Sequence, residues 1–216
     1  MGRAKDVWIE AQHHEAAMSS KRSGDGAPVV LIPPVKSWQF LPASSAETGI
    51  KSVPLAHKQR PIVLSIQNAF SPFEPSAYVE GATRKTLTLR LNKEWDGAFD
   101  CFEACLLYEV AARSQEIFGR SLGEEELAEM YKPLTRKSGE YPRNLRVKLN
   151  TTGVYQVRFW ASDKTRLDAP ATLADTPVNA RVALRAVWIG DDAWGIVADC
   201  TDVQFVGLSS DECPFE

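Results

Sequence analysis

Apolar and polar positions alternate most clearly over residues 84–92, where three leucines alternate with threonine and basic residues. A period of two predicts a strand with one face buried and one in water. Weaker patterns of the same kind predict strands over residues 61–69, 145–149, 155–160, 181–189, 193–199 and 203–206. The last three are expected to form an antiparallel meander whose first turn is Gly190-Asp191-Asp192.

The period changes to that of a helix over residues 95–118. Apolar side chains recur there at helical spacing, at Phe99, Phe102, Leu106, Val110 and Ile117. Gly119 follows as a helix stop. A second short helix is predicted over residues 123–131, because its three leading glutamates suit the positive end of a helix dipole.

The order of these elements is strands, then a helix pair, then more strands, with no repeating βαβ unit. That order favours a mainly β, antiparallel α+β domain, or a small barrel with a helical insertion at about residues 95–131. Residues 1–27 are polar and predict a flexible arm. Residues 28–40 are extended, and Pro33-Pro34 would place any strand there at a sheet edge. Residues 43–60 are predicted to be a loop. The folded domain is expected to span residues 28–208, and residues 209–216 an acidic tail.

Composition is that of an ordinary globular protein, with 44% hydrophobic and 25% charged residues and a net charge of −3. The apolar runs are too short to cross a bilayer, so no membrane association is expected. The first residues carry charge with no apolar stretch behind them, which argues against a secretory signal. We therefore expect an intracellular protein: in the nucleus or a viral replication compartment for a eukaryotic or viral source, in the cytoplasm for a bacterial or phage source.

Charge is segregated along the chain. Residues 132–166 hold nine basic residues against two acidic ones, whereas residues 191–216 hold seven acidic residues and no Lys or Arg. The basic segment also carries aromatic residues. Cations that follow phosphates and rings that stack on bases are the pattern of single-stranded nucleic-acid binding. The candidate binding residues are Lys132, Arg136, Lys137, Tyr141, Arg143, Arg146, Lys148, Tyr155, Arg158, Trp160, Lys164 and Arg166.

Strand alternation sorts these candidates by face. Arg146 and Lys148 should point to one side of their strand, opposite the apolar residues. In the next strand Trp160 should share a face with Arg158, and Phe159 should point the other way. The competing interpretation is a solvated strand face that is merely rich in Arg and Lys. Trp188 and Trp194 are interpreted mainly as core residues.

No constellation in the sequence indicates catalysis. Phosphate-loop, zinc-protease and nucleophile-elbow motifs are missing, and the three histidines lie in segments of low order. We expect no enzyme activity, no catalytic residues, no metal and no cofactor. Cys101 and Cys105 share one helix face and suit packing better than zinc. Asp199 and Asp202 suit a strand end better than a paired-carboxylate metal site.

Two segments carry a family resemblance, Tyr141 to Leu149 and the run Ala-Val-Trp-Ile-Gly-Asp-Asp-Ala-Trp-Gly-Ile from Ala186. Roughly residues 61–216 resemble the OB-fold single-stranded-DNA-binding proteins of podophages and large eukaryotic DNA viruses. The resemblance implies an antiparallel, five-stranded OB-like barrel with Arg146, Lys148 and Arg158 along the groove. It also implies an acidic tail that recruits replication proteins. This tail is short and ends in Glu216 instead of Phe.

We therefore expect a protein that binds single-stranded nucleic acid, most simply DNA, without regard to sequence, in replication, recombination or repair. Its tail residues Asp211, Glu212, Pro214 and Phe215 would contact protein partners. RNA as a ligand and self-association both stay open. The alternative is a structural or assembly protein, such as a virion component, that docks other chains through its arm and tail.

Overall fold

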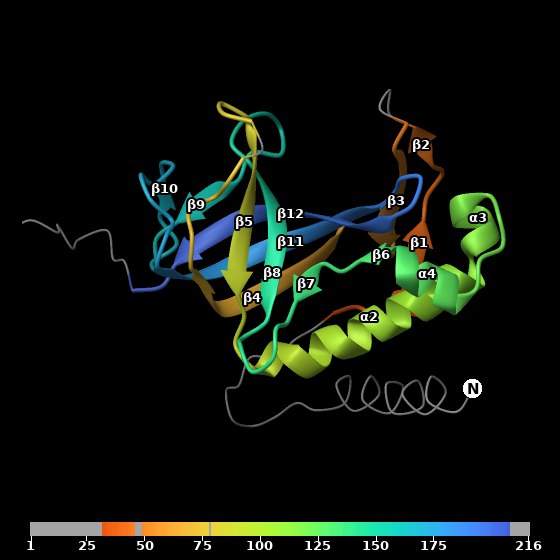
Figure 1. The fold of residues 1–216 in the computed structure, drawn as a ribbon. Helices are drawn as coiled ribbons and strands as arrows, with labels where there is room; N and C mark the ends of the chain where they lie inside the picture. Colours follow the sequence, from red (N-terminus) through yellow and green to blue (C-terminus); the bar gives the residue numbers. More distant parts are fainter. Residues whose placement is uncertain (1–31, 46–48, 78, 208–216) are drawn as a thin grey trace, which may run out of the picture. The chain divides into compact units, whose positions relative to one another are not determined.

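The computed structural model describes residues 32–45, 49–77 and 79–207 (Figure 1). The predicted arm at 1–27 and the tail at 209–216 lie outside these ranges. The chain forms two compact units. Unit 1 comprises the described residues up to Ile62, with Glu94–Pro133 and Arg185–Ile196. Unit 2 comprises Val63–Lys93, Leu134–Leu184 and the described residues from Val197.

Unit 1 holds the helices of the predicted insertion. Helix α2 (Glu94–Ala112) is followed by α3 (Ser114–Phe118) and α4 (Glu124–Met130). The predicted apolar stripe is buried, from Phe99 through Val110 on α2 to Ile117 on α3. Gly119 ends α3 with a left-handed φ of 79°, and its N–H donates to the Gln115 carbonyl at 3.1 Å. The stop signal is confirmed, because glycine adopts that conformation without steric cost.

The strands of unit 1 centre on β3 (Lys51–His57), which pairs antiparallel with β1 (Trp38–Phe40), β2 (Ser44–Ser45) and the end of β11. A short 3-10 turn, η1 (Val35–Ser37), precedes β1. The prediction of a loop over residues 43–60 was wrong. Val53 and Leu55 are buried between strand neighbours that are distant in sequence, and those partners hold β3 extended. The edge position expected for the Pro33-Pro34 segment is confirmed, since β1 pairs with β3 alone.

Trp194, at the start of β12 (Trp194–Phe205), packs against α4 and β6 in unit 1. Its indole N–H donates to the Leu127 carbonyl at 2.9 Å, and its ring lies 4.6 Å from that of Tyr131 on β6 (Tyr131–Lys132). Trp194 is fully buried, as predicted, whereas Trp188 is only half-buried. Gly195 lies against the indole of Trp188 and the Lys132 carbonyl, where a side chain has no room.

Unit 2 is built on β4 (Ile62–Ser71), β5 (Arg84–Arg90), β8 (Asn144–Asn150) and most of β11 (Thr176–Ile189) and β12 (Trp194–Phe205). Pairings run β11-β4-β5-β8-β12, and β11 also pairs with β12, so these five strands form a closed ring. Strands β5 and β8 lie side by side over seven residue pairs, from Arg84↔Asn150 to Arg90↔Asn144 (Figure 1). Shorter strands complete the unit: β7 (Thr135–Arg136), β9 (Arg158–Trp160) and β10 (Arg166–Leu167).

Two topological expectations need correction. The sheet is mixed, because β12 runs parallel to β6, β8 and β9, where a wholly antiparallel sheet was predicted. β12 is also one continuous strand where two were predicted with a break at residues 200–202. The polar run Thr201-Asp202 resembles a turn in sequence, but hydrogen bonding to β9 holds it in the strand. No helix of the described residues is long and apolar enough to cross a membrane.

Candidate nucleic-acid interface

Strand β8 alternates between core and surface as predicted. Leu145, Val147 and Leu149 are buried, and Arg146 and Lys148 are exposed. Residues directly opposite on an antiparallel pair share a face, which places Thr86 beside Lys148. The Lys148 ammonium donates to the Thr86 hydroxyl at 3.2 Å. Both candidate cations therefore stand on the outer face of the ring.

The cations on this face crowd one another. Partial burial lowers the pKa of Lys148, the charges of Arg84 and Arg146 lower it further, and Asp199 opposes them. The Asp199 carboxylate accepts a charged hydrogen bond from Arg84 at 3.1 Å. The surface formed by Arg146 and Lys148 is here called the β8 face. With Arg84 nearby and Asp199 as the opposing carboxylate, it has a positive field suited to phosphate.

Strand β9 places the predicted ring beside the predicted cation. Phe159 points into the core and is 6% exposed, whereas Arg158 and Trp160 point outward. The alternation predicted for these three residues is confirmed. The strand is shorter than expected and begins at Arg158. Residues 154 and 155 belong to a turn, and Tyr155 is exposed.

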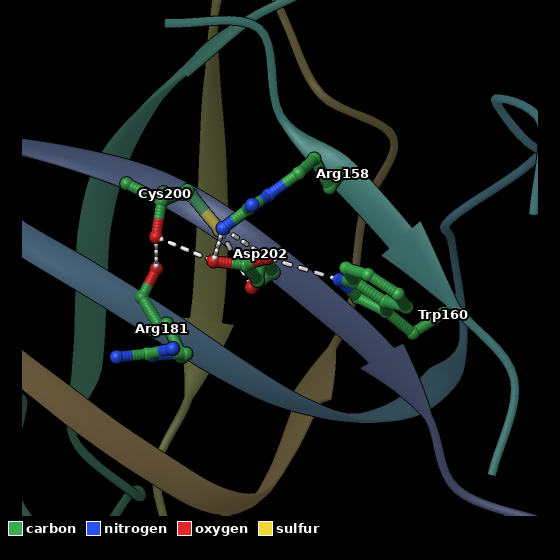
Figure 2. Close-up of polar contacts among 6 residues, drawn as sticks. Arg158, Trp160, Arg181, Cys200 and Asp202 are labelled. Atoms are coloured by element: carbon green, nitrogen blue, oxygen red, sulfur yellow. Dashed lines mark hydrogen bonds and ion pairs between the residues drawn. The ribbon is translucent and has the colours of Figure 1, made fainter. Parts of the chain in front are cut away.

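Asp202 on β12 ties this ring and this cation together (Figure 2). Its carboxylate contacts the Arg158 guanidinium at 2.8 and 2.9 Å and accepts the indole N–H of Trp160 at 2.9 Å. The Thr201 hydroxyl donates to it as well, at 2.9 Å. Burial by itself would raise the pKa of Asp202, but the hydrogen bonds from Arg158, Trp160 and Thr201 outweigh that effect and hold its pKa below the ordinary value.

A slip in the alternation of β12 brings Asp202 to the outer face. Cys200 and Val203 are both fully buried although they are three residues apart. Thr201 and Asp202 both lie between these two core positions, so the inward–outward phase shifts by one residue. Beyond the slip, Asp202 lies opposite Arg158 and Gln204 opposite Trp160.

The Trp160 indole forms cation–π contacts with two arginines. The guanidinium carbon of Arg158 lies 5.8 Å from the ring centroid, and that of Arg166, from β10, lies 5.7 Å away. Such contacts contribute about 0.5–1 kcal/mol each at exposed sites. The arrangement, here called the Trp160 cluster, combines an aromatic surface with two phosphate-binding cations.

The Trp160 cluster borders a groove of about 510 Å³ on the outer face of unit 2. Its charged lining consists of Arg158, Lys164, Arg181 and Asp202, a net excess of cations. The rest of the lining is uncharged: Ser65, Ile66, Gln67, Trp160, Asn179, Ala180 and Gln204.

Two of the three amides that line the groove, those of Asn179 and Gln204, are engaged within the protein. Gln204 donates to the carbonyls of Ala161 and Ser162 at 3.3 and 3.2 Å, and Asn179 donates to Gln204 at 3.1 Å. The Asn179 oxygen accepts the Asn68 N–H at 3.0 Å. Asn179 and Gln204 are therefore less available to a ligand than the groove's cations and the Trp160 ring.

The predicted binding residues divide into several sets. Arg158, Trp160 and Lys164 line the groove, Arg166 joins the Trp160 cluster, and Arg146 and Lys148 form the β8 face. Lys132 belongs to unit 1. Arg136, Lys137, Tyr141 and Tyr155 are exposed outside the groove lining.

The structure corrects the predicted surface position of Arg143. It is 4% exposed and donates to the Thr135 hydroxyl at 2.8 Å, which removes it from the candidate surface. Its place among basic neighbours in the sequence suggested a phosphate contact. Pairing of β7 with β8 instead encloses the side chain.

Sequence reasoning missed Arg181 and the role of Asp202. Arg181 is exposed on β11 between the buried Ala180 and Val182, so strand alternation alone marks it as outward. It was overlooked because it lies outside the basic segment. Asp202 was considered only as part of a carboxylate pair with Asp199. Each of these two carboxylates pairs with an arginine, and the described residues contain no cluster of three or more His, Cys, Asp or Glu side chains fit to hold a metal.

No protein-family model and no curated protein sequence matches this chain. Solved structures of phage proteins are similar to it. The single-stranded DNA-binding protein of bacteriophage Enc34, solved in complex with ssDNA, is 13% identical, with 82% of this chain and 99% of that chain covered and a TM-score of 0.47. The single-stranded DNA-binding protein gp2.5 of bacteriophage T7 is 12% identical, with 70% and 90% covered and a TM-score of 0.48. These similarities concern the phage part of the predicted resemblance and do not test the part that concerns large eukaryotic DNA viruses.

Proposed function

We propose that unit 2 binds single-stranded DNA without regard to base sequence and that the Trp160 cluster is the centre of the interface. The observation that carries the proposal is a half-exposed indole in contact with two arginines at the edge of a cationic groove. A base stacked on such a ring contributes about 1–3 kcal/mol, whatever its identity. The guanidinium planes offer further stacking surface beside the phosphates they attract.

The chemistry of the groove supports lack of sequence preference. Reading a base edge requires donors and acceptors aimed at the ligand. The amides of Asn179 and Gln204 instead bond to the protein itself. Arg158, Lys164 and Arg181 carry charge, which follows the phosphates of any sequence.

The β8 face extends the proposed path. Arg146 and Lys148 stand on the strand next to β12 in the ring, and β12 carries Asp202 of the Trp160 cluster. A closed ring of five strands with a ligand on its outer face is the arrangement of an OB-fold. We accordingly interpret the ring as an OB-like barrel that presents one continuous binding surface.

The biological role follows as part of the proposal. A sequence-independent, non-catalytic binder of single strands serves replication, recombination or repair, where duplexes are opened. The acidic residues and Phe215 at the end of the chain suit recruitment of protein partners, because a short acidic segment with one aromatic can anchor in a basic apolar pocket.

A tryptophan fluorescence titration tests this proposal. Oligo-dT is added to the protein at several salt concentrations, with a blunt duplex of equal length as control. We expect quenching by oligo-dT, and an affinity that falls linearly with salt on a log–log plot, because binding releases counterions. If oligo-dT causes no quenching and no salt-dependent binding is seen at low ionic strength, the proposed function is rejected.

A further inference from the structure

We infer that Asp202 is a positioning residue of the interface: it holds the Trp160 ring and the Arg158 guanidinium in the orientation that receives a single strand. This inference rests on the proposed function. Asp202 carries the wrong charge for a group that touches phosphate. Its value to binding would therefore lie in the two side chains that it holds.

The contacts of Asp202 match such a role. One carboxylate oxygen accepts the Trp160 indole N–H at 2.9 Å and contacts Arg158 at 2.8 Å. The other accepts from Arg158 and from the Thr201 hydroxyl, each at 2.9 Å. A single carboxylate thus fixes both the plane of the ring and the place of the guanidinium. Side chains fixed before binding lose less conformational entropy when the ligand arrives.

The backbone keeps this carboxylate in place. Asp202 lies directly opposite Arg158 in the register of β12 with β9, and the next outward position, Gln204, lies opposite Trp160. The neighbouring core residues Cys200 and Val203 are fully buried on either side. Asp202 is itself 7% exposed. A buried carboxylate on a paired strand is a more rigid support than a group on a loop.

The chain offers a matched control on the same strand. Asp199 has the same charge, its side chain is 9% exposed against 10% for Asp202, and it too pairs with an arginine, Arg84. Asp202 additionally accepts the indole N–H of Trp160. Replacing either aspartate by asparagine removes one negative charge from the outer face. Only Asp202→Asn changes the support of the ring.

The two roles predict opposite signs. If Asp202 were only a counterion, its loss would free a cation and tighten binding of a polyanion, as loss of Asp199 should. If it positions Arg158 and Trp160, its loss weakens binding although the net charge becomes more favourable. The comparison separates orientation from charge.

The experiment measures oligo-dT affinity and maximal tryptophan quenching for wild type, Asp199→Asn and Asp202→Asn at low and physiological salt. We expect Asp202→Asn to weaken binding roughly tenfold, the scale of one lost charged hydrogen bond, with reduced quenching. We expect Asp199→Asn to tighten binding at low salt. Equal tightening by both variants, or no change with Asp202→Asn, would overturn the inference.

A second variant and a ligand-free readout keep the test decisive. Thr201→Val removes one donor to Asp202 and leaves its charge, so it should weaken binding in the same direction by a smaller factor. If Asp202→Asn fails to fold, unchanged binding by Thr201→Val contradicts the inference.

Hydrogen exchange in the free protein gives a readout that needs no ligand. The Trp160 indole N–H resonance, assigned with Trp160→Phe, should be protected from exchange in wild type and Asp199→Asn. Thr201→Val should shorten that protection, and Asp202→Asn, if folded, should shorten it further, because an amide oxygen accepts the indole N–H more weakly than a carboxylate oxygen does. Failure of wild type to bind oligo-dT would reject the proposed function, and the exchange result would then decide on the positioning role alone.

Discussion

Lys148 and Asp199 lie opposite each other on the parallel strands β8 and β12, yet each makes its short polar contact with strand β5. Lys148 donates to the Thr86 hydroxyl at 3.2 Å, and Asp199 accepts from Arg84 at 3.1 Å. Asp199 is near enough to raise the pKa of Lys148, but partial burial and the charges of Arg84 and Arg146 lower it more. The charged form of Lys148 is disfavoured by the cations around it, so a bound phosphate would stabilise that charge.

We therefore predict that Arg146→Ala combined with Lys148→Ala weakens single-strand binding equally for all base compositions. Each substitution removes a phosphate partner, so the slope of log affinity against log salt should become shallower by about one unit per contact. Titrations with oligo-dT, oligo-dA and a mixed sequence at several salt concentrations check this. A loss confined to one base composition would contradict the proposed role of the β8 face.

Trp160→Ala should cost about 1–3 kcal/mol of binding free energy, because it removes the ring on which a base is proposed to stack. Trp160→Phe keeps a smaller ring and should retain part of the affinity. Since the indole N–H is lost, it also lacks the hydrogen bond to Asp202. Both variants should lose most of the fluorescence quenching on oligo-dT. Quenching equal to that of wild type would place the stacking site elsewhere.

Removal of residues 209–216 should tighten nucleic-acid binding at low salt and abolish partner recruitment. The segment carries the carboxylates of Asp211, Glu212 and Glu216, which compete with phosphate for cations. Such competition is screened over about 8 Å at physiological salt. Affinities of the full-length and truncated proteins at two salt concentrations check this. Equal affinities at low salt would show that the tail does not compete.

Gly195→Ala should destabilise unit 1 by about 1–3 kcal/mol, the usual cost of overpacking. A Cβ at this position would lie 2.8 Å from the Lys132 carbonyl oxygen and 2.9 Å from the indole nitrogen of Trp188. Gly97→Ala is the control, because this position in α2 has nothing within 4 Å. It should stabilise the helix by about 0.5–1 kcal/mol. Urea unfolding of both variants measures the difference, and equal effects would contradict the packing argument.

Cys200 should resist alkylation in the native protein. Burial raises its pKa to about 12, with the charge of Asp202 adding to that effect, and the thiolate is the reactive form. Because the pKa of this thiol is higher in the folded state than in the unfolded state, its contribution to the free energy of unfolding is complete at pH values below the ordinary thiol pKa. That contribution declines as the pH rises toward 12. In a variant with Cys101, Cys105 and Cys213 replaced by serine, iodoacetamide at pH 8 should label Cys200 only in denaturant. Rapid labelling of the native protein would show that the site is open.

Local periodicity in the sequence was enough to predict several features of the site. The alternation in β5 and β8 predicted which side chains face outward, and parity in β9 placed Trp160 with Arg158 and Phe159 in the core. The helical spacing from Phe99 to Ile117 predicted the buried stripe, and Gly119 its end. These predictions succeed because side-chain direction follows from backbone conformation within a few residues.

Only the tertiary structure decided which distant residues meet. The Arg158–Asp202 pair joins positions 44 residues apart, and the slip in β12 that turns Asp202 toward Arg158 depends on the pairing of β12 with β8 and β9. The same is true of Arg143, buried by the pairing of β7 with β8, and of β3, held extended by β1 and β11. Strand pairing over long separations is set by packing of the whole core, and a local pattern of apolar residues does not specify the partner.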